Sequence, residues 1–96
     1  MKATYIVHGF VQGVGYRAYV KGLAEKLGIG GIAMNQSDGS VLVIVQGEEG
    51  ILKRFEEGLN LSMKYGIQVH SIEKQYDSDG DNTAQIDFST FSIMKG

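Results

Sequence analysis

Residues 11–17, with the sequence VQGVGYR, constrain the fold of this chain more than any other stretch. The preceding residues 3–10 are apolar and rich in β-prone side chains, which predicts a strand over about 4–10. After the stretch, apolar residues recur at helical spacing, which predicts a helix over 17–27 that stops at Gly28. Gly13 and Gly15 therefore lie in a turn between a strand and the start of a helix.

A turn of this kind is suited to binding an anion. Glycines let successive backbone N–H groups converge without interference from a Cβ atom. The N-terminus of a helix adds partial positive charge, and Arg17 brings a planar fork of donors that suits phosphate or carboxylate. No acidic residue precedes Glu25, so the local field is positive although the net charge is −2. We interpret the turn as a binding loop for a small dianion, with a phosphoryl group as the first choice.

Length and composition indicate one globular domain, which we expect to span residues 1–96. The chain has no cysteine, so a metal site would require its two histidines and its carboxylates. It shows neither a secretory leader pattern nor an apolar run near the roughly 18 residues of a membrane span. We therefore expect a cytoplasmic protein that binds no membrane, and the net charge argues against a nucleic-acid partner. We expect a monomer.

The middle of the chain reads as a β-hairpin. Gly28, Gly30 and Gly31 predict a tight and flexible connection after the first helix. Strands are predicted at 32–35 and 41–46, joined by the Ser37-Asp38-Gly39-Ser40 turn, because an Asp-Gly pair tolerates the positive φ of hairpin turns. Five consecutive apolar residues from Val41 favour a central position for the second of these strands.

The second half of the chain predicts one helix and two strands. The helix opens near residues 47–50, and its expected buried face comprises Ile51, Leu52, Phe55 and Leu59. Imperfect alternation in a strand over 67–76 predicts a bulge. Residues 77–85 read as a polar, acidic loop, and residues 88–94 as a final strand.

The resulting order, β-α-β-β-α-β with a terminal strand, predicts a ferredoxin-like α+β sandwich. Right-handed crossovers favour an antiparallel sheet with both helices on one face. This fold hosts many activities, so it leaves function open.

Other motifs in the chain fail on their context. Residues 13–18 satisfy the dinucleotide pattern G-x-G-x-x-A, but the acid expected about 20 residues on would be Asp38, which falls in the hairpin turn. Residues 77–81 hint at a calcium loop, but Asn82 and Phe88 stand where Gly and Glu are needed. We interpret His8 as a structural residue at a strand end. The strand over 41–46 lacks the aromatic residues of an RNA-binding sheet.

The sequence thus offers an anion-binding loop without an evident acid, base or nucleophile. A phosphoryl transfer that needs no general acid requires a good leaving group. An acyl phosphate has one, because its leaving carboxylate has a pKa near ~4. Positioning and charge stabilisation could then suffice.

Residues 8–17, HGFVQGVGYR, followed by Leu27-Gly28, Gly31, Asn35 and Asp38-Gly39, resemble the acylphosphatase family. The resemblance implies hydrolysis of the carboxyl–phosphate bond of small acyl phosphates to a carboxylate and inorganic phosphate, without a metal or cofactor. It implies that the guanidinium of Arg17 binds the phosphate, and that Asn35 orients the attacking water. The backbone amides that it assigns to the phosphate are those of Gly13, Val14, Gly15, Tyr16 and Arg17.

The chain departs from the family pattern immediately before Asn35. Ile32, Ala33 and Met34 stand where Trp-Val-Arg is common, which bears on local packing and surface charge. An alternative interpretation is a non-catalytic phosphate- or carbamoyl-phosphate-binding module of the same fold. A third is an interaction domain that uses the open face of the sheet.

Overall fold

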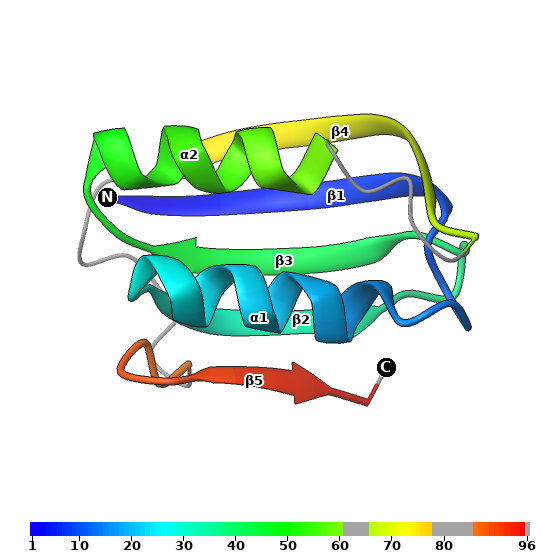
Figure 1. Cartoon of the computed structure of the whole chain (residues 1–96), viewed down its shortest axis with the longest axis horizontal. Coiled ribbons are helices and arrows are strands. Elements are labelled where there is room, and N and C mark those ends of the chain that lie inside the picture. Colours follow the sequence, from blue (N-terminus) through cyan, green and yellow to red (C-terminus); the bar gives the residue numbers. More distant parts are fainter. Residues whose placement is uncertain (61–65, 78–85, 96) are drawn as a thin grey trace.

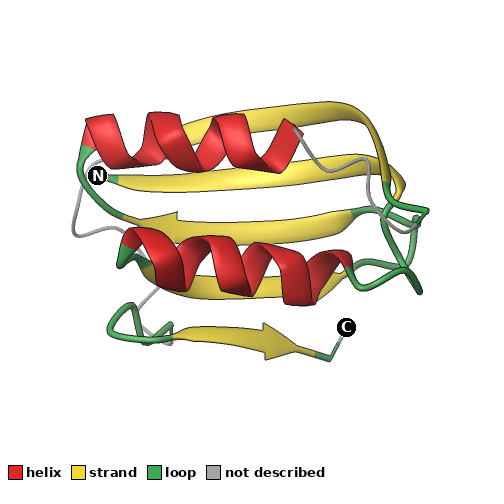
Figure 2. Ribbon diagram, in the orientation of Figure 1, coloured by secondary structure: helices red, strands yellow, loops and turns green. Residues whose placement is uncertain are grey.

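The computed structural model describes residues 1–60, 66–77 and 86–95. Both helices in these ranges cover the same face of a single sheet (Figures 1 and 2), which confirms the ferredoxin-like α+β sandwich. In chain order the elements are β1 (Lys2–Phe10), α1 (Tyr16–Leu27), β2 (Gly30–Asn35), β3 (Val41–Gln46), α2 (Glu49–Asn60), β4 (Gln68–Asp77) and β5 (Phe91–Met94).

The strand order is β4-β1-β3-β2-β5, so β3 lies in the centre as predicted. Val41, Val43 and Val45 are fully buried under the helices, whereas Leu42 and Ile44 are half-buried on the other face. β3 pairs antiparallel with β1 and β2, and β1 pairs antiparallel with β4. β5 joins the outer edge of β2 in parallel, so the complete sheet is mixed.

The predicted bulge lies where β1 pairs with β4. His8 pairs with Ser71 but Gly9 pairs with Val69, so His70 is the extra residue. An extra residue of this kind bends a strand and interrupts its alternation. This explains why the apolar pattern of β4 looked irregular.

The final strand is shorter than predicted. It begins at Phe91, and residues 88–90 form a turn instead. The Asp87 carboxylate accepts hydrogen bonds from the Ser89 backbone N–H (2.9 Å) and hydroxyl (2.5 Å). This local side-chain cap favours a turn over an extended chain. Of the predicted acidic loop, only Asp77 is described, as the last residue of β4, and residues 78–85 lie outside the described residues.

Two glycines assigned to a flexible connection instead belong to β2. A Cβ atom on Gly30 would lie 1.9 Å from the Phe88 carbonyl oxygen, and one on Gly31 would lie 1.9 Å from that of Ile44. Glycine is required in these places because neighbouring backbone approaches closely.

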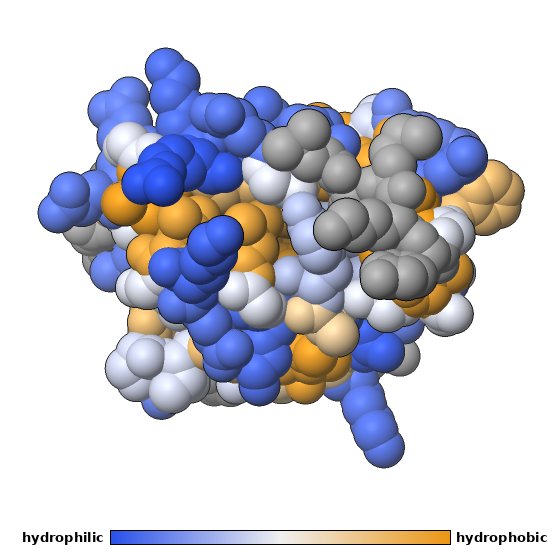
Figure 3. Space-filling view, in the orientation of Figure 1, coloured by the Kyte–Doolittle hydropathy of each residue, from blue (hydrophilic) through white to orange (hydrophobic). Residues whose placement is uncertain are grey.

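The core lies between the sheet and the helices. Tyr5, Tyr16 and Phe55 are its largest fully buried side chains. On α2, Leu52, Phe55 and Leu59 are buried as predicted, and Ile51 is half-buried against the core. In the view onto the helices, apolar surface gathers between α1 and α2 and is bordered by hydrophilic residues (Figure 3). Within the described ranges, neither helix has the length and apolar character needed to cross a bilayer.

Candidate active site

The loop between β1 and α1 uses its glycines for conformation rather than for space. Gly13 has a φ of 74° and Gly15 a φ of 82°, both in the left-handed region. A Cβ atom added to either would meet nothing within 4 Å. Residues with a Cβ atom rarely adopt this backbone conformation. The loop therefore needs glycine at both positions to reverse the chain into α1.

The N-terminus of α1 has neither a side-chain cap nor an acidic residue in its first turn. Gly15 is the N-cap residue and has no side chain with which to cap the helix. The first-turn N–H groups have no acceptor within the helix, and the helix dipole adds partial positive charge there.

A cavity of about 160 Å³ lies beside this helix end. It brings together four of the five predicted phosphate-loop residues, Gly13, Gly15, Tyr16 and Arg17. Val14 does not line the cavity; its side chain packs against the hydrophobic core. The remaining lining residues are Val11, Ala18 and Ile93.

Arg17 is the second residue of α1, and β5 positions its side chain. One guanidinium nitrogen, Nη1, donates a hydrogen bond of 3.0 Å to the Met94 carbonyl oxygen. Sequence reasoning missed this role of the last strand, to which Ile93 also belongs. The only signal available was an apolar terminal segment, which does not reveal the strand's partner.

Asn35 is the last residue of β2. The end of β2 lies at the same end of the sheet as the β1–α1 loop (Figure 1). In the sheet register Val41 pairs with both Asn35 and Val7 of β1. The Oδ1 atom of Asn35 is buried, and no hydrogen-bonding group among the described residues contacts it. Asn35 is not a lining residue of the 160 Å³ cavity.

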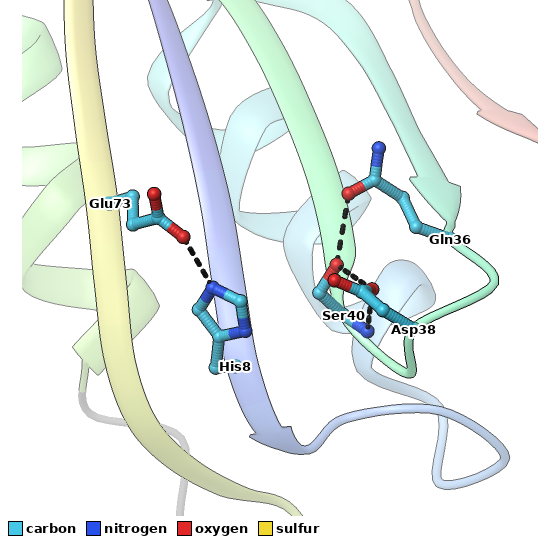
Figure 4. Close-up of polar contacts among 5 residues, drawn as sticks. All are labelled: His8, Gln36, Asp38, Ser40 and Glu73. Atoms are coloured by element: carbon cyan, nitrogen blue, oxygen red, sulfur yellow. Dashed lines mark hydrogen bonds and ion pairs between the residues drawn. The ribbon is translucent and has the colours of Figure 1, made fainter.

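The hairpin that follows Asn35 is fixed by its own polar side chains (Figure 4). Asp38 Oδ1 accepts hydrogen bonds from the Ser40 hydroxyl and from the Ser40 backbone N–H, which lower the pKa of Asp38 below its ordinary value. Ser40 Oγ also lies 2.9 Å from Gln36 Oε1. Asp38 therefore stabilises the hairpin turn. The dinucleotide pattern would instead require this acid at the end of a parallel strand.

The two histidines lie apart from the cavity. His8 Nε2 is 2.6 Å from a Glu73 carboxylate oxygen on the neighbouring strand (Figure 4), and the His70 ring meets Phe10 edge-on. Within the described part of the chain, no three histidine or carboxylate side chains are grouped closely enough to hold a metal ion.

The three departures from the family pattern are divided between the two faces of the sheet. Ala33 is fully buried under the helices, whereas Ile32 and Met34 are half-buried on the open face of the sheet. Met34 pairs with Leu42 and Met94 in the sheet register.

The fold and the β1–α1 glycine loop define the class as a small ferredoxin-like α+β protein with a cavity at a helix N-terminus. Comparison with known proteins identifies the family: the acylphosphatase family model matches residues 3–93. An acylphosphatase of Deinococcus radiodurans is 40% identical over 79 residues, which cover 82% of this chain and 90% of that protein. One of Lactobacillus gasseri is 35% identical over 95% of this chain and 94% of the relative.

Solved structures agree. The crystal structure of the Bacillus subtilis acylphosphatase superposes with a TM-score of 0.83 at 30% identity and covers 97% of both chains. The structure of T. kodakarensis HypF matches 98% of this chain but only 12% of its own length, with a TM-score of 0.77 at 28% identity. This chain belongs to the acylphosphatase family, and the relationship supports acyl phosphate hydrolysis as its activity. Membership favours the catalytic interpretation over the phosphate-binding module.

Proposed function

We propose that this protein hydrolyses the carboxyl–phosphate bond of small acyl phosphates at the 160 Å³ cavity. The backbone N–H groups of residues 13–17 and the Arg17 guanidinium bind the phosphate, and Asn35 orients the attacking water. The observation that carries the proposal is the convergence of Gly13, Gly15, Tyr16 and Arg17 on one cavity at an uncapped helix N-terminus.

The reaction needs little chemistry from side chains. Water attacks phosphorus, the bond from phosphorus to the acyl oxygen breaks, and the carboxylate leaves with the electron pair. A carboxylate is a good leaving group without protonation, because its pKa is about 4. The water's proton passes to a phosphate oxygen, since an amide is too weak a base to accept it. The protein contributes by positioning the reactants and by stabilising the charge that develops on the phosphoryl oxygens.

The environment of Asn35 supports its assignment to the water. A buried acceptor without a partner destabilises a protein by about 1–3 kcal/mol. Such groups are rare, and a catalytic role or a bound water is among the reasons for which they occur. The buried Oδ1 of Asn35 has no hydrogen-bonding partner among the described residues. A water that donates to this oxygen would satisfy it and would lie at the end of the sheet from which α1 begins.

The test is the hydrolysis of benzoyl phosphate by Asn35→Ala. We expect kcat to fall about 100-fold, in the range found when one positioning group is lost. Inhibition by inorganic phosphate should stay within about threefold, because the binding loop is intact. Asn60→Ala, at the exposed end of α2, is the matched control and should behave as wild type. An Asn35→Ala protein with wild-type kcat would show that Asn35 does not orient the water.

We also propose that the protein is cytoplasmic and monomeric. Sedimentation equilibrium should give the chain mass of 10.4 kDa. A stable dimer would instead support the interpretation of the open sheet face as an interaction surface.

A further inference from the structure

The proposed site has two halves that the sheet alone does not connect firmly. The 13–17 loop follows β1, and Asn35 ends β2, with β3 between these strands. The last pair in the β1–β3 ladder is Val7 with Val41. Beyond Val7, β1 pairs only with β4 as it runs toward the loop. Main-chain pairing between β1 and β3 therefore stops well before the residues that would bind phosphate.

One side chain, that of Gln12, connects the 13–17 loop to the hairpin that follows Asn35. The Gln12 amide nitrogen, Nε2, donates to two carbonyl oxygens, that of Gln36 at 2.7 Å and that of Ser40 at 2.9 Å. An amide NH₂ has two hydrogens, so both are used and the side chain is fixed in one orientation. Gln12 is half-buried, which shields these bonds from competing water.

The two acceptors belong to a turn that is already rigid. The Gln36 backbone N–H donates to the Ser40 carbonyl at 2.9 Å, and the Gly39 N–H donates to the Gln36 carbonyl at 3.1 Å. The side chains of Gln36, Asp38 and Ser40 add further bonds across the turn (Figure 4). Gln12 therefore links the loop to a turn that is held by its own hydrogen bonds.

The positions of these residues in the chain give the link its consequence. Gln12 immediately precedes Gly13, and Gln36 immediately follows Asn35. We infer that Gln12 is a positioning residue, which sets the distance between the bound phosphate and the water oriented by Asn35. This inference rests on the proposed function of the site. Misplacing reacting groups by about 1 Å can reduce a rate about 100-fold, so a link at this place bears directly on kcat.

The test separates positioning from binding. Gln12→Met retains the length of the side chain and removes both donors. We expect kcat for benzoyl phosphate to fall at least tenfold, while inhibition by inorganic phosphate changes less than threefold, because the 13–17 loop still binds phosphate. Val45→Ala, fully buried at the other end of β3, is the control for lost stability; it should lower the urea midpoint and leave kcat within twofold of wild type.

The double variant tests whether Gln12 acts through Asn35. In an Asn35→Ala background, Gln12→Met should lower the remaining kcat less than twofold, because residues that act as a unit have non-additive effects. Losses that multiply, or a Gln12→Met protein with kcat within twofold of wild type, would overturn the inference. If Gln12→Met does not fold, Gln12→Asn replaces it, with the amide withdrawn by one methylene and the same outcomes.

The single Asn35→Ala variant distinguishes failure of the proposed function from failure of the positioning role of Gln12. If it retains wild-type kcat, the proposed function of Asn35 is wrong, and the role of Gln12 fails with it. If it loses kcat while Gln12→Met does not, only the positioning role is wrong.

Discussion

Replacement of Arg17 by alanine should separate the activity of this protein from its stability. The side chain lines the cavity and donates a 3.0 Å hydrogen bond to the Met94 carbonyl oxygen at an exposed position. An exposed bond of this kind contributes about 1 kcal/mol or less to stability. Loss of one preorganised donor to a transition state costs about 3 kcal/mol, and a guanidinium offers several donors. We therefore expect kcat/KM for benzoyl phosphate to fall at least about 100-fold, with a change in unfolding free energy within about 1 kcal/mol.

Two further variants make this expectation specific. Arg17→Lys retains the charge but loses the planar fork, so its kcat/KM should lie between those of wild type and Arg17→Ala. Lys21→Ala removes the same charge one helical turn away, from a residue that does not line the cavity. It should keep kcat/KM within threefold of wild type. The reasoning is refuted if Arg17→Ala and Lys21→Ala have similar kcat/KM, because the guanidinium would then act only through its distant charge.

Tyr5 and Tyr76 both donate hydrogen bonds to Glu56 of α2, and these bonds give two predictions on stability. Tyr5 is fully buried and donates a 2.7 Å hydrogen bond to the Glu56 carboxylate. Tyr5→Phe should therefore lower the unfolding free energy measured with urea by about 2 kcal/mol without changing kcat. An unchanged urea midpoint would contradict this prediction. The Tyr76 hydroxyl also donates to Glu56, and this bond, with burial, raises the pKa of Tyr76 from 10.0 to about 12. Because the folded protein binds the phenolic proton more tightly, this stabilisation is complete below pH 10 and is lost as the pH rises through about 12. Tyr76→Phe should therefore weaken the fall in melting temperature across that range, and an unaltered pH profile would argue against the bond.

Features encoded by a few neighbouring residues could be predicted from the sequence. Gly13 and Gly15 adopt the positive φ that their turn requires, and so does Gly39 in the hairpin, with a φ of 93°. The central place of β3 and the bulge in β4 followed from apolar runs and broken alternation. In each case the residues that signal the feature lie within a few positions of one another in the sequence.

Features that depend on distant partners could not be predicted. Gly58 is a weak helix former, and its sequence position indicates only a fraying helix end. In the fold, a Cβ atom there would lie 2.5 Å from a Leu23 methyl carbon, so the glycine permits close packing of the two helices.

The candidate site shows the same division. The glycine loop and Arg17 were found from local sequence, but the supports of the site were not. Gln12 reaches carbonyls 24 and 28 positions away, and Arg17 reaches Met94, 77 positions away. Backbone carbonyls carry no residue-specific signal, so no sequence pattern marks them as acceptors.

The most direct measurement is a titration of the ¹⁵N-labelled protein with inorganic phosphate, followed by the backbone amide resonances. If main-chain donors and Arg17 bind the phosphoryl group, the largest saturable shifts should fall on the amides of residues 13–17 and on the Arg17 Nε–H. Arg17→Ala should weaken the binding without moving the shifts elsewhere. Saturable shifts centred on another part of the molecule, with residues 13–17 unmoved, would contradict the account.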